Sequence, residues 1–367
     1  MLKTAPAVFA VADTYQIMVE TKQEALFWVR IGDEEYFDES NGIMNSLADI
    51  HRVKVPMDVL NEAGTYTVCV RPIIERKPYF TQTADVWEKT YAFRPVPKEN
   101  IRIYHISDAH NRVSLPVQAA RAFGEIDLLV LNGDVIDHSG DPSKFSNVYE
   151  ICSILTGGAL PVVFSRGNHD MRGRYAERFA DYTPNHLGNT YYTFRLGSLW
   201  GLLVDCGEDK PDSNEEYGYT VAWHVFRKRQ TKFLYEMIRN AENEYAAEGV
   251  KKRIVIAHKP FTQRDVHPFD IEEEIFTEWC TLLREYVHPD LMLCGHTHQI
   301  EIRLPGHERD HYGQACPVVI GAQPEEELFV GCGFVLRESN ADVVFTDSEG
   351  EVLSKEIIQY GLHNTEQ

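Results

Sequence analysis

The chain has 367 residues and an ordinary globular composition, with 43% hydrophobic and 25% charged residues. That length is long for a single core and sufficient for two. The net charge of −20 argues against a broad surface for polyanions such as nucleic acid, although bound cations could still attract a phosphorylated molecule. The seven cysteines show no short regular spacing, so buried thiols in a reducing compartment are expected.

A short apolar run at residues 5–12 could imitate the hydrophobic part of a secretory signal, but a β-strand explains it as well. No apolar run approaches the ~18–20 residues that a membrane span needs. We therefore expect a cytoplasmic protein that does not contact a membrane. The sequence gives no indication of the oligomeric state.

The first 98 residues predict an all-β region, because short β-rich runs alternate with Gly, Asp and Asn. The segment from Leu60 to Tyr66 is similar to the tyrosine corner of immunoglobulin-like and fibronectin-type domains. We therefore predict an N-terminal β-sandwich domain over residues 1–98, followed by a proline-containing linker. The expected strands are 14–20, 24–30, 50–55, 65–71 and 88–94.

From Ile101 onward the pattern changes to alternating strands and helices, which predicts a second domain of the α/β class over residues 99–367. The expected helix at 225–247 has the clearest apolar face. The other expected helices are 116–124, 142–156 and 271–287, and the expected strands are 101–106, 127–131, 161–164, 190–196, 199–205, 253–257, 291–294, 318–321, 328–335 and 342–346. The final residues 364–367 are expected to fray.

Five of these strands lead to side chains that can bind a metal. The first three clusters are Asp108-Ala-His110, Gly133-Asp134-Val-Ile-Asp137 and Gly167-Asn168-His169-Asp170, and the last two are His258 and Gly295-His296-Thr-His298. Carboxylates, imidazoles and an amide oxygen are suitable ligands for a divalent metal. Each cluster alone is frequent by chance, but the complete ordered set is not.

In this order the five pieces resemble the motif of the calcineurin-like metallophosphoesterase superfamily, from Ile101 to the last cluster. The resemblance implies a four-layer fold of two mixed sheets flanked by helices, and two metal ions per chain. Asp134 would bridge the ions, with Asp108, His110 and His298 on one ion and Asn168, His258 and His296 on the other. The set contains no thiolate, which suits Mn, Fe, Zn or Ni.

The resemblance also implies hydrolysis of phosphoesters by a water or hydroxide that the two metals activate. His169 is the expected general acid, and Asp137 would orient and charge its imidazole. Because position 137 is an aspartate where purple acid phosphatases have a metal-binding tyrosine, an iron–tyrosinate centre is not expected. Arg166 and Arg172 are candidates for contact with the phosphate, and a structural role is the alternative for each.

Four further expectations concern the surroundings of these motifs. Asp170 either supports the ligand loop or caps a turn. Gly133, Gly167 and Gly295 each precede a ligand, so close packing or a positive φ is expected there. The loops 206–224 and 259–270 are expected to form the rim of the site. The acids at 272–274 are expected at a helix N-terminus and not in a metal cluster.

The expected substrate is a small or medium-sized phosphomonoester or phosphodiester. Two alternatives remain open, a nuclease that uses the same site and a non-catalytic metal-binding scaffold. The acidic charge and the lack of a basic groove with interleaved aromatic residues argue against the nuclease. The presence of His169 argues against the scaffold, because a scaffold does not need a general acid.

Overall fold

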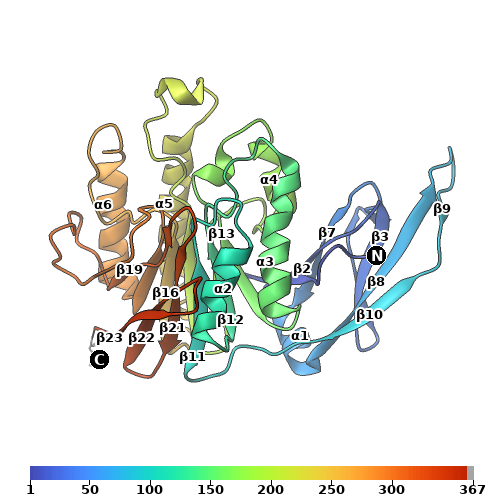
Figure 1. Ribbon diagram of the computed structural model, residues 1–367, viewed down its shortest axis with the longest axis horizontal. Coiled ribbons are helices and arrows are strands. Elements are labelled where there is room, and N and C mark those ends of the chain that lie inside the picture. The colour runs from blue at the N-terminus through green and yellow to red at the C-terminus, as the bar shows by residue number, and fades with distance from the viewer. Residues whose placement is uncertain (362–367) are drawn as a thin grey trace.

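The computed structural model describes residues 1–361 (Figure 1), so the predicted frayed end at 364–367 lies outside the described residues. Its largest sheet has ten strands. In spatial order they are β23 (Val352–Gln359), β22 (Asn340–Asp347), β21 (Phe329–Leu336), β11 (Ile101–Ile106), β12 (Leu128–Asn132), β13 (Pro161–Ser165), β1 (Ala7–Val11), β2 (Thr14–Glu20) and β7 (Ile50–Pro56), and β20 (Gln323–Pro324) pairs with β21.

A second sheet has six strands and packs against the first. In spatial order these are β14 (Tyr192–Leu196), β15 (Leu199–Val204), β16 (Lys252–Ala257), β17 (Leu291–Cys294), β19 (Val318–Ile320) and β18 (Glu301–Arg303). The strands β12 and β13 are apolar up to their last residues, Asn132 and Ser165, and both are buried along their whole length. Such runs are typical of parallel strands that are covered on both faces.

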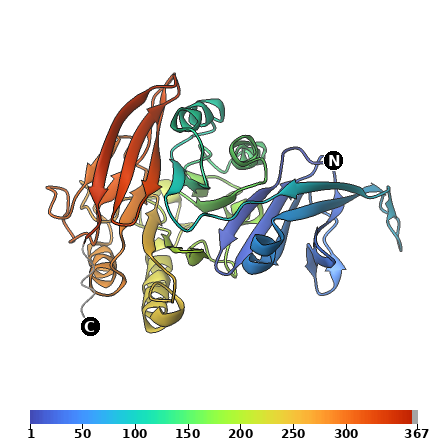
Figure 2. The same cartoon turned by 90° about the horizontal axis from the view of Figure 1, so that it is seen from below.

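Helices cover the outer faces of these two sheets (Figure 2). The helices α2 (Ser114–Phe123) and α3 (Ser146–Thr156) contact the ten-stranded sheet, and α5 (Trp223–Arg239) and α6 (Glu273–Leu282) pack on the six-stranded sheet. In β16, Ile254 and Ile256 belong to the core between the sheets, whereas Val255 packs with the helices. This layered arrangement confirms the predicted α/β class.

The predicted helix at 225–247 is too long, because α5 ends at Arg239. The main-chain N–H of Asn240 bonds to two carbonyls of the last turn, those of Glu236 and Met237, and the chain then turns through a short 3-10 segment. Tyr245 fits the apolar pattern of the predicted helix although it lies beyond the end of α5. Its ring packs 5.7 Å from the ring of Trp200, outside the helix.

The first 98 residues are divided between two sheets. The strand β1 pairs in parallel with β13, with Val8 opposite Pro161, so β1, β2 and β7 extend the ten-stranded sheet. The strands β4 (Glu34–Phe37), β3 (Ala25–Ile31), β8 (Thr65–Glu75), β9 (Gln82–Thr83) and β10 (Trp87–Ala92) form a separate sheet, and β5 (Glu39–Ser40) pairs with β6 (Ile43–Met44). The domain boundary at residue 98 stays a prediction. Strands from both sides of residue 98 pair within the ten-stranded sheet.

An immunoglobulin-like or fibronectin-like sandwich is not confirmed. A short helix, α1 (Met57–Ala63), interrupts the strands that were expected to be all β. The hydroxyl of Tyr66 donates to the main-chain oxygen of Gly158 at 2.8 Å, in the loop between α3 and β13. A tyrosine corner instead bonds a few residues upstream in the same domain.

The seven cysteines are buried free thiols, as expected. The helices α4 (Phe179–Tyr182) and α1 are short, and none of the helices within residues 1–361 is long and apolar enough to cross a membrane.

Candidate metal centre

The five motif pieces meet at the carboxyl ends of strands from both large sheets. The neighbouring parallel strands β11, β12 and β13 lead to Asp108, Asp134 and Asn168. The parallel strands β16 and β17 lead to His258 and His296 in the other sheet. Ligand sites of α/β folds typically lie at such strand ends. Here the side chains from the two sheets face each other.

One ligand group consists of Asp108, His110 and His298, whose donor atoms lie within 4.8 Å of one another. Nε2 of His110 lies 3.2 Å from Nε2 of His298, and the latter atom lies 3.3 Å from Oδ1 of Asp108. Two facing imidazole nitrogens need a proton or a cation between them, because each neutral acceptor nitrogen presents a lone pair. This is the group expected to hold one ion.

The second group consists of Asp134, His258 and His296, again within 4.8 Å. Nδ1 of His258 donates to the main-chain oxygen of Asn132 at 2.8 Å, which leaves Nε2 available as a ligand. That buried Nε2 makes no hydrogen bond of acceptable geometry, although Oδ2 of Asp134 lies 3.0 Å away. Asn168 adds a neutral oxygen, since its Oδ1 lies 2.9 Å from Nδ1 of His296.

These residues fit a pair of divalent cations. Asp108 and Asp134 are 0% and 1% exposed, and two buried carboxylates need positive charge nearby. The Nε2 of His258 that lacks a partner is the kind of buried polar atom that a cation would satisfy. The donors are oxygen and nitrogen, which suits the predicted Mn, Fe, Zn or Ni. The number and identity of the ions stay predictions.

The charges of the two groups interact. Burial raises the pKa of Asp108 and of Asp134, but the charges and hydrogen bonds of the surrounding histidines, His258 foremost, together outweigh it, and both pKa values lie below the ordinary value. Burial alone would lower the pKa of His258, but the two carboxylates raise it to about 10. In His296, burial and the charge of His258 lower the pKa to about 4. A proton on His258 therefore supplies part of the positive charge that the carboxylates need.

Five of the seven predicted ligands have a left-handed backbone. Their φ angles are 54° at Asp108, 44° at His110, 52° at Asp134, 71° at His296 and 56° at His298. This conformation is uncommon for residues other than glycine and costs about 1–3 kcal/mol in strained sites. Backbone strain is therefore concentrated at the residues that were predicted from the motif.

The glycines before the ligands leave no room for a side chain. A Cβ at Gly167 would lie 2.1 Å from Oδ1 of Asp134, and a Cβ at Gly295 would lie 1.8 Å from Oγ of Ser107. Gly133 has a φ of +81°. Close packing and positive φ, both expected from the sequence, explain these positions.

Asp170 holds the ligand loops from inside the protein. Its Oδ2 accepts hydrogen bonds from the main-chain N–H of Gly167 at 2.7 Å and of Asp134 at 3.0 Å. Burial and the charge of Asp134 raise the pKa of Asp170 to about 7. Of the two roles that the sequence left open, these contacts favour support of the ligand loops.

His169 lies beside the first ligand group, with its ring centroid 4.7 Å from that of His110. Its Nδ1 donates to the main-chain oxygen of Asp137 at 2.8 Å, whereas Oδ1 of the Asp137 carboxylate lies 3.7 Å from the same nitrogen. The main chain of Asp137, more than its carboxylate, therefore orients the ring. The catalytic roles of both residues stay predictions.

Arg166 contacts groups other than the predicted metal ligands. Its Nε donates to the buried carboxylate of Asp205, and its guanidinium carbon lies 5.5 Å and 5.4 Å from the ring centroids of Trp223 and Phe226. These contacts favour the structural alternative for Arg166. Contact between Arg166 and a substrate stays a prediction.

Arg172 lies closer to the predicted chemistry. It makes two hydrogen bonds to the carboxylate of Glu208, at 2.9 Å and 2.8 Å, and donates to Nε2 of His169 at 3.2 Å. Contact between Arg172 and a substrate also stays a prediction. Glu208 was not singled out from the sequence, because no motif connects it with the ligand clusters.

A cavity of about 630 Å³ opens over the site. Its walls include four predicted ligands and His169. The rest of the wall includes residues of segment 263–269, within the predicted rim loop 259–270, and Arg309 and His311, which carried no motif signal. The predicted rim loop 206–224 contributes Asp209. The predicted ligands in the wall are Asp134, Asn168, His296 and His298.

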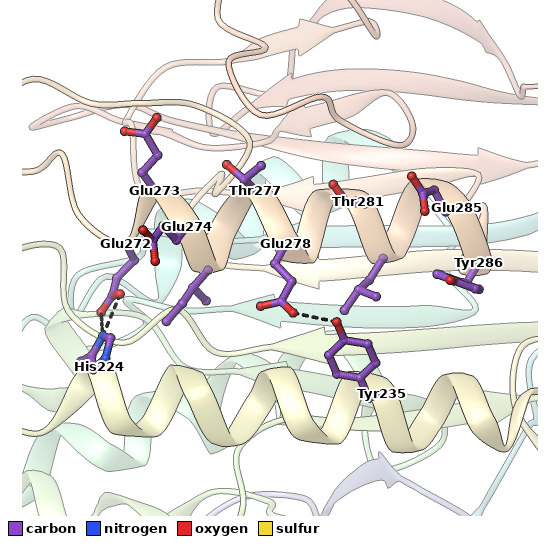
Figure 3. Close-up of a pocket in the computed structure, with 12 residues that line it drawn as sticks. His224, Tyr235, Glu272, Glu273, Glu274, Thr277, Glu278, Thr281, Glu285 and Tyr286 are labelled. Atoms are coloured by element: carbon purple, nitrogen blue, oxygen red, sulfur yellow. Dashed lines mark hydrogen bonds and ion pairs between the residues drawn. The ribbon is translucent and has the colours of Figure 1, made fainter.

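A larger cavity, of about 960 Å³, lies between α5 and α6 and contains none of the predicted ligands (Figure 3). Glu272, Glu273 and Glu274 line it at the start of α6, as expected for acids at a helix N-terminus. Figure 3 shows Glu272 bonded to His224, and the two atoms lie 3.0 Å apart. The metal centre and this acidic groove are separate features.

The layered fold and the two ligand groups at its strand ends are those of a metal-binding α/β protein. A sequence model described as calcineurin-like phosphoesterase matches residues 101–300. Since this match covers more than half of the chain, the protein belongs to the calcineurin-like phosphoesterase family, as the motif predicted. Members of this family bind divalent metals.

Solved structures also resemble the chain. A purple acid phosphatase from seeds of yellow lupin (Lupinus luteus) is 13% identical, with 98% of this chain and 75% of that chain covered and a TM-score of 0.58. A single mutant of Vps29 from Entamoeba histolytica is 12% identical, with 71% of this chain and 100% of that chain covered and a TM-score of 0.33. The lupin match shows a shared fold. No curated protein matches the sequence.

Proposed function

We propose that this protein is a metal-dependent hydrolase of phosphoesters that acts on a small or medium-sized phosphomonoester or phosphodiester. The observation that carries this proposal is the convergence of two oxygen and nitrogen ligand groups beside His169, with members of both groups in the wall of one cavity. Membership of the family supports the same reaction. A cytoplasmic location remains part of the proposal, and cell fractionation tests it.

A bound pair of divalent ions would lower the pKa of a bound water and offset the charge of the phosphoryl group. Asp134 would contribute to holding both ions, and the remaining ligands would complete the two groups. His169 would donate a proton to the leaving oxygen. Its Nδ1 is engaged by the main chain of Asp137, so Nε2 is the nitrogen left for this transfer.

Metal content and a substrate panel test the proposal. We expect about two transition-metal ions per chain by elemental analysis. The reconstituted protein is then assayed on a phosphomonoester, a phosphodiester, a nucleotide, a phosphoprotein and a nucleic acid. Hydrolysis of a small ester supports the proposal. A protein that cannot be loaded with metal, or that is loaded and cleaves none of the panel, contradicts it, and cleavage of nucleic acid alone favours the nuclease.

Two substitutions separate metal binding from proton donation. Asp134→Asn should lose both metal and activity. His169→Ala should keep the metal and lose about 10²–10⁴-fold in kcat, the usual contribution of a general acid. Arg178→Ala is a matched surface control, since Arg178 is exposed and pairs with Asp181. If His169→Ala keeps full activity, the general acid is another group.

A further inference from the structure

A series of hydrogen bonds leads from α5 to the predicted general acid. Arg227 of α5 is 1% exposed and donates to the main-chain oxygens of Cys206 at 2.7 Å and Glu208 at 2.5 Å. It also donates to Oε1 of Glu272 at 3.0 Å. A buried guanidinium with a hydrogen bond at each of its three nitrogens has little freedom to move. The main chain of the segment after β15 is therefore fixed by the helix.

Glu208 in this segment holds Arg172. Glu208 is 1% exposed, and its two carboxylate oxygens accept from Nε and Nη2 of Arg172. Asp209 Oδ1 lies 3.4 Å from the same Nη2, and the hydroxyl of Tyr217 donates to Glu208 Oε2 at 3.3 Å. Two parallel N–H···O bonds between an arginine and a carboxylate define the plane of the guanidinium as well as its position.

The remaining donor of Arg172, Nη1, bonds to Nε2 of His169 at 3.2 Å. The other ring nitrogen, Nδ1, bonds to the main-chain oxygen of Asp137. Since arginine is always a donor and a carbonyl oxygen always an acceptor, these two bonds assign the ring proton to Nδ1 and the lone pair to Nε2. A hydrogen bond at each nitrogen also fixes the plane of the ring.

We infer that Arg172, held by Glu208 and Asp209, is a positioning residue that fixes the plane and the tautomer of His169. The inference rests on the proposed function only for the catalytic role of His169. In the observed arrangement Nε2 carries the lone pair, so His169 acts as an acid only after Nε2 has taken up a proton from solvent, which replaces the hydrogen bond from the guanidinium. Donation of that proton to the leaving oxygen then returns the ring to the observed Nδ1–H form. The two bonds to Glu208 do not have to break when this happens.

The ring proton gives a test that does not depend on activity. In protein labelled with ¹⁵N-histidine and supplied with Zn²⁺, nitrogen–proton spectra should place the proton of His169 on Nδ1. The signals are assigned by their loss in His169→Asn. Arg172→Ala should raise the share of the Nε2–H form, which free histidine prefers in water, because only the main-chain oxygen of Asp137 then holds the proton on Nδ1, and Arg178→Ala should leave that share unchanged. An Nε2–H ring in the wild type, or an unchanged ring in Arg172→Ala, overturns the inference.

Kinetics with esters of different leaving groups give the second test. For an alkyl phosphate, which needs a proton on leaving, Arg172→Ala should lower kcat by about 10–10²-fold, the usual effect of a misplaced catalytic group. For p-nitrophenyl phosphate the loss should be much smaller, and KM and inhibition by inorganic phosphate should be unchanged. An equal loss for all esters with weaker phosphate inhibition overturns the inference and makes Arg172 a phosphate-binding residue.

Two milder variants keep the test decisive if Arg172→Ala does not fold. Glu208→Gln keeps the shape of the side chain but weakens its hold on Arg172, and Arg172→Lys keeps a donor without the paired contact. Both variants should show the same shift of the ring proton and the same loss of kcat as Arg172→Ala, but to a smaller extent. A wild type with the Nδ1–H ring that hydrolyses no ester would contradict the proposed function and leave the positioning geometry supported.

Discussion

At the scale of single residues, the metal centre combines good ligands with an unfavourable backbone. Asp108, His110, Asp134, His296 and His298 all have positive φ. Asparagine, aspartate and histidine tolerate this region better than most residues, but glycine tolerates it best. A substitution at one of these positions should therefore change the free energy of unfolding through the backbone, separately from its effect on metal binding.

The strain at His298 can be measured with two variants that both lack the ligand. Because φ is 56° there, the metal-free His298→Gly protein should be about 1 kcal/mol more stable to urea than His298→Ala. The opposite order is expected at the exposed helical position Lys232 of α5, where alanine should be more stable than glycine by a similar amount. Equal stability of the two His298 variants would contradict a strained backbone.

The protonation of His258 predicts how metal affinity depends on pH. The carboxylates raise the pKa of His258 to about 10, so the metal-free protein at pH 7 holds a proton that a metal ion must displace. Zinc binding should therefore release protons, and the affinity should rise with pH up to about 10. Calorimetry in buffers of different ionisation enthalpy measures the release, and binding without proton release at pH 7 would show that His258 is neutral there.

At the scale of elements, one side chain connects the N-terminal strands with the ligand-bearing sheet. Tyr66 on β8 is 1% exposed and bonds to the oxygen of Gly158, just before β13. Burial raises the pKa of Tyr66, so its hydroxyl remains a donor. This hydrogen bond attaches the segment before β13 to the five-stranded sheet that contains β8 and carries no predicted ligand.

Removal of this hydroxyl should destabilise the fold. Tyr66→Phe leaves a buried carbonyl without its partner, which costs about 1–3 kcal/mol. Urea unfolding measures the loss, and Tyr79→Phe is the control, since Tyr79 is 92% exposed. A change smaller than that of the control would mean that water or another donor replaces the hydroxyl.

The sequence predicted the elements that carry the ligands because physical signals agree there. The runs in β12 and β13 are apolar up to their last residues, Asn132 and Ser165, and a predicted ligand follows each strand within three residues. The strand β23 was missed because most of its residues are exposed and its pattern lacks a buried face. The helix α1 has seven residues, which is too short for a clear period.

Which segments lie next to each other in space was harder to predict than which segments form strands or helices. The run at 5–12 indicates a strand, but nothing in it specifies β13 as its neighbour, which lies far along the chain. In the same way, the motif predicted which residues gather at the site. It did not indicate Glu208, Arg309 or His311, because loops from unrelated segments bring these side chains to it.

At the scale of the whole molecule, the first 98 residues and the rest share one sheet. The strand β1 is almost completely buried, and it lies between β13 and β2. Figure 1 shows that β8, β9 and β10 extend outward from this region as an arm. Whether the residues after the predicted boundary at 98 can fold without the first 98 residues can therefore be tested.

Deletion of residues 1–98 should abolish cooperative unfolding, because it uncovers the edge of β13 and the apolar surface under β1. Deletion of residues 77–81, at the exposed end of the arm, should leave cooperative unfolding intact. Thermal melts followed by circular dichroism compare the two. A stable, cooperative protein after the first deletion would establish residues 99–361 as an independent domain.

The position of the metal centre between the two sheets also has a consequence for maturation. Asp108 comes from the ten-stranded sheet, whereas His296 and His298 follow β17 of the six-stranded sheet, 188 and 190 positions further along the chain. During synthesis neither ligand group is complete until this last cluster has left the ribosome. Under the proposed function, metal loading would thus be a late event that requires both sheets, and the ions would link the first and the last parts of the site.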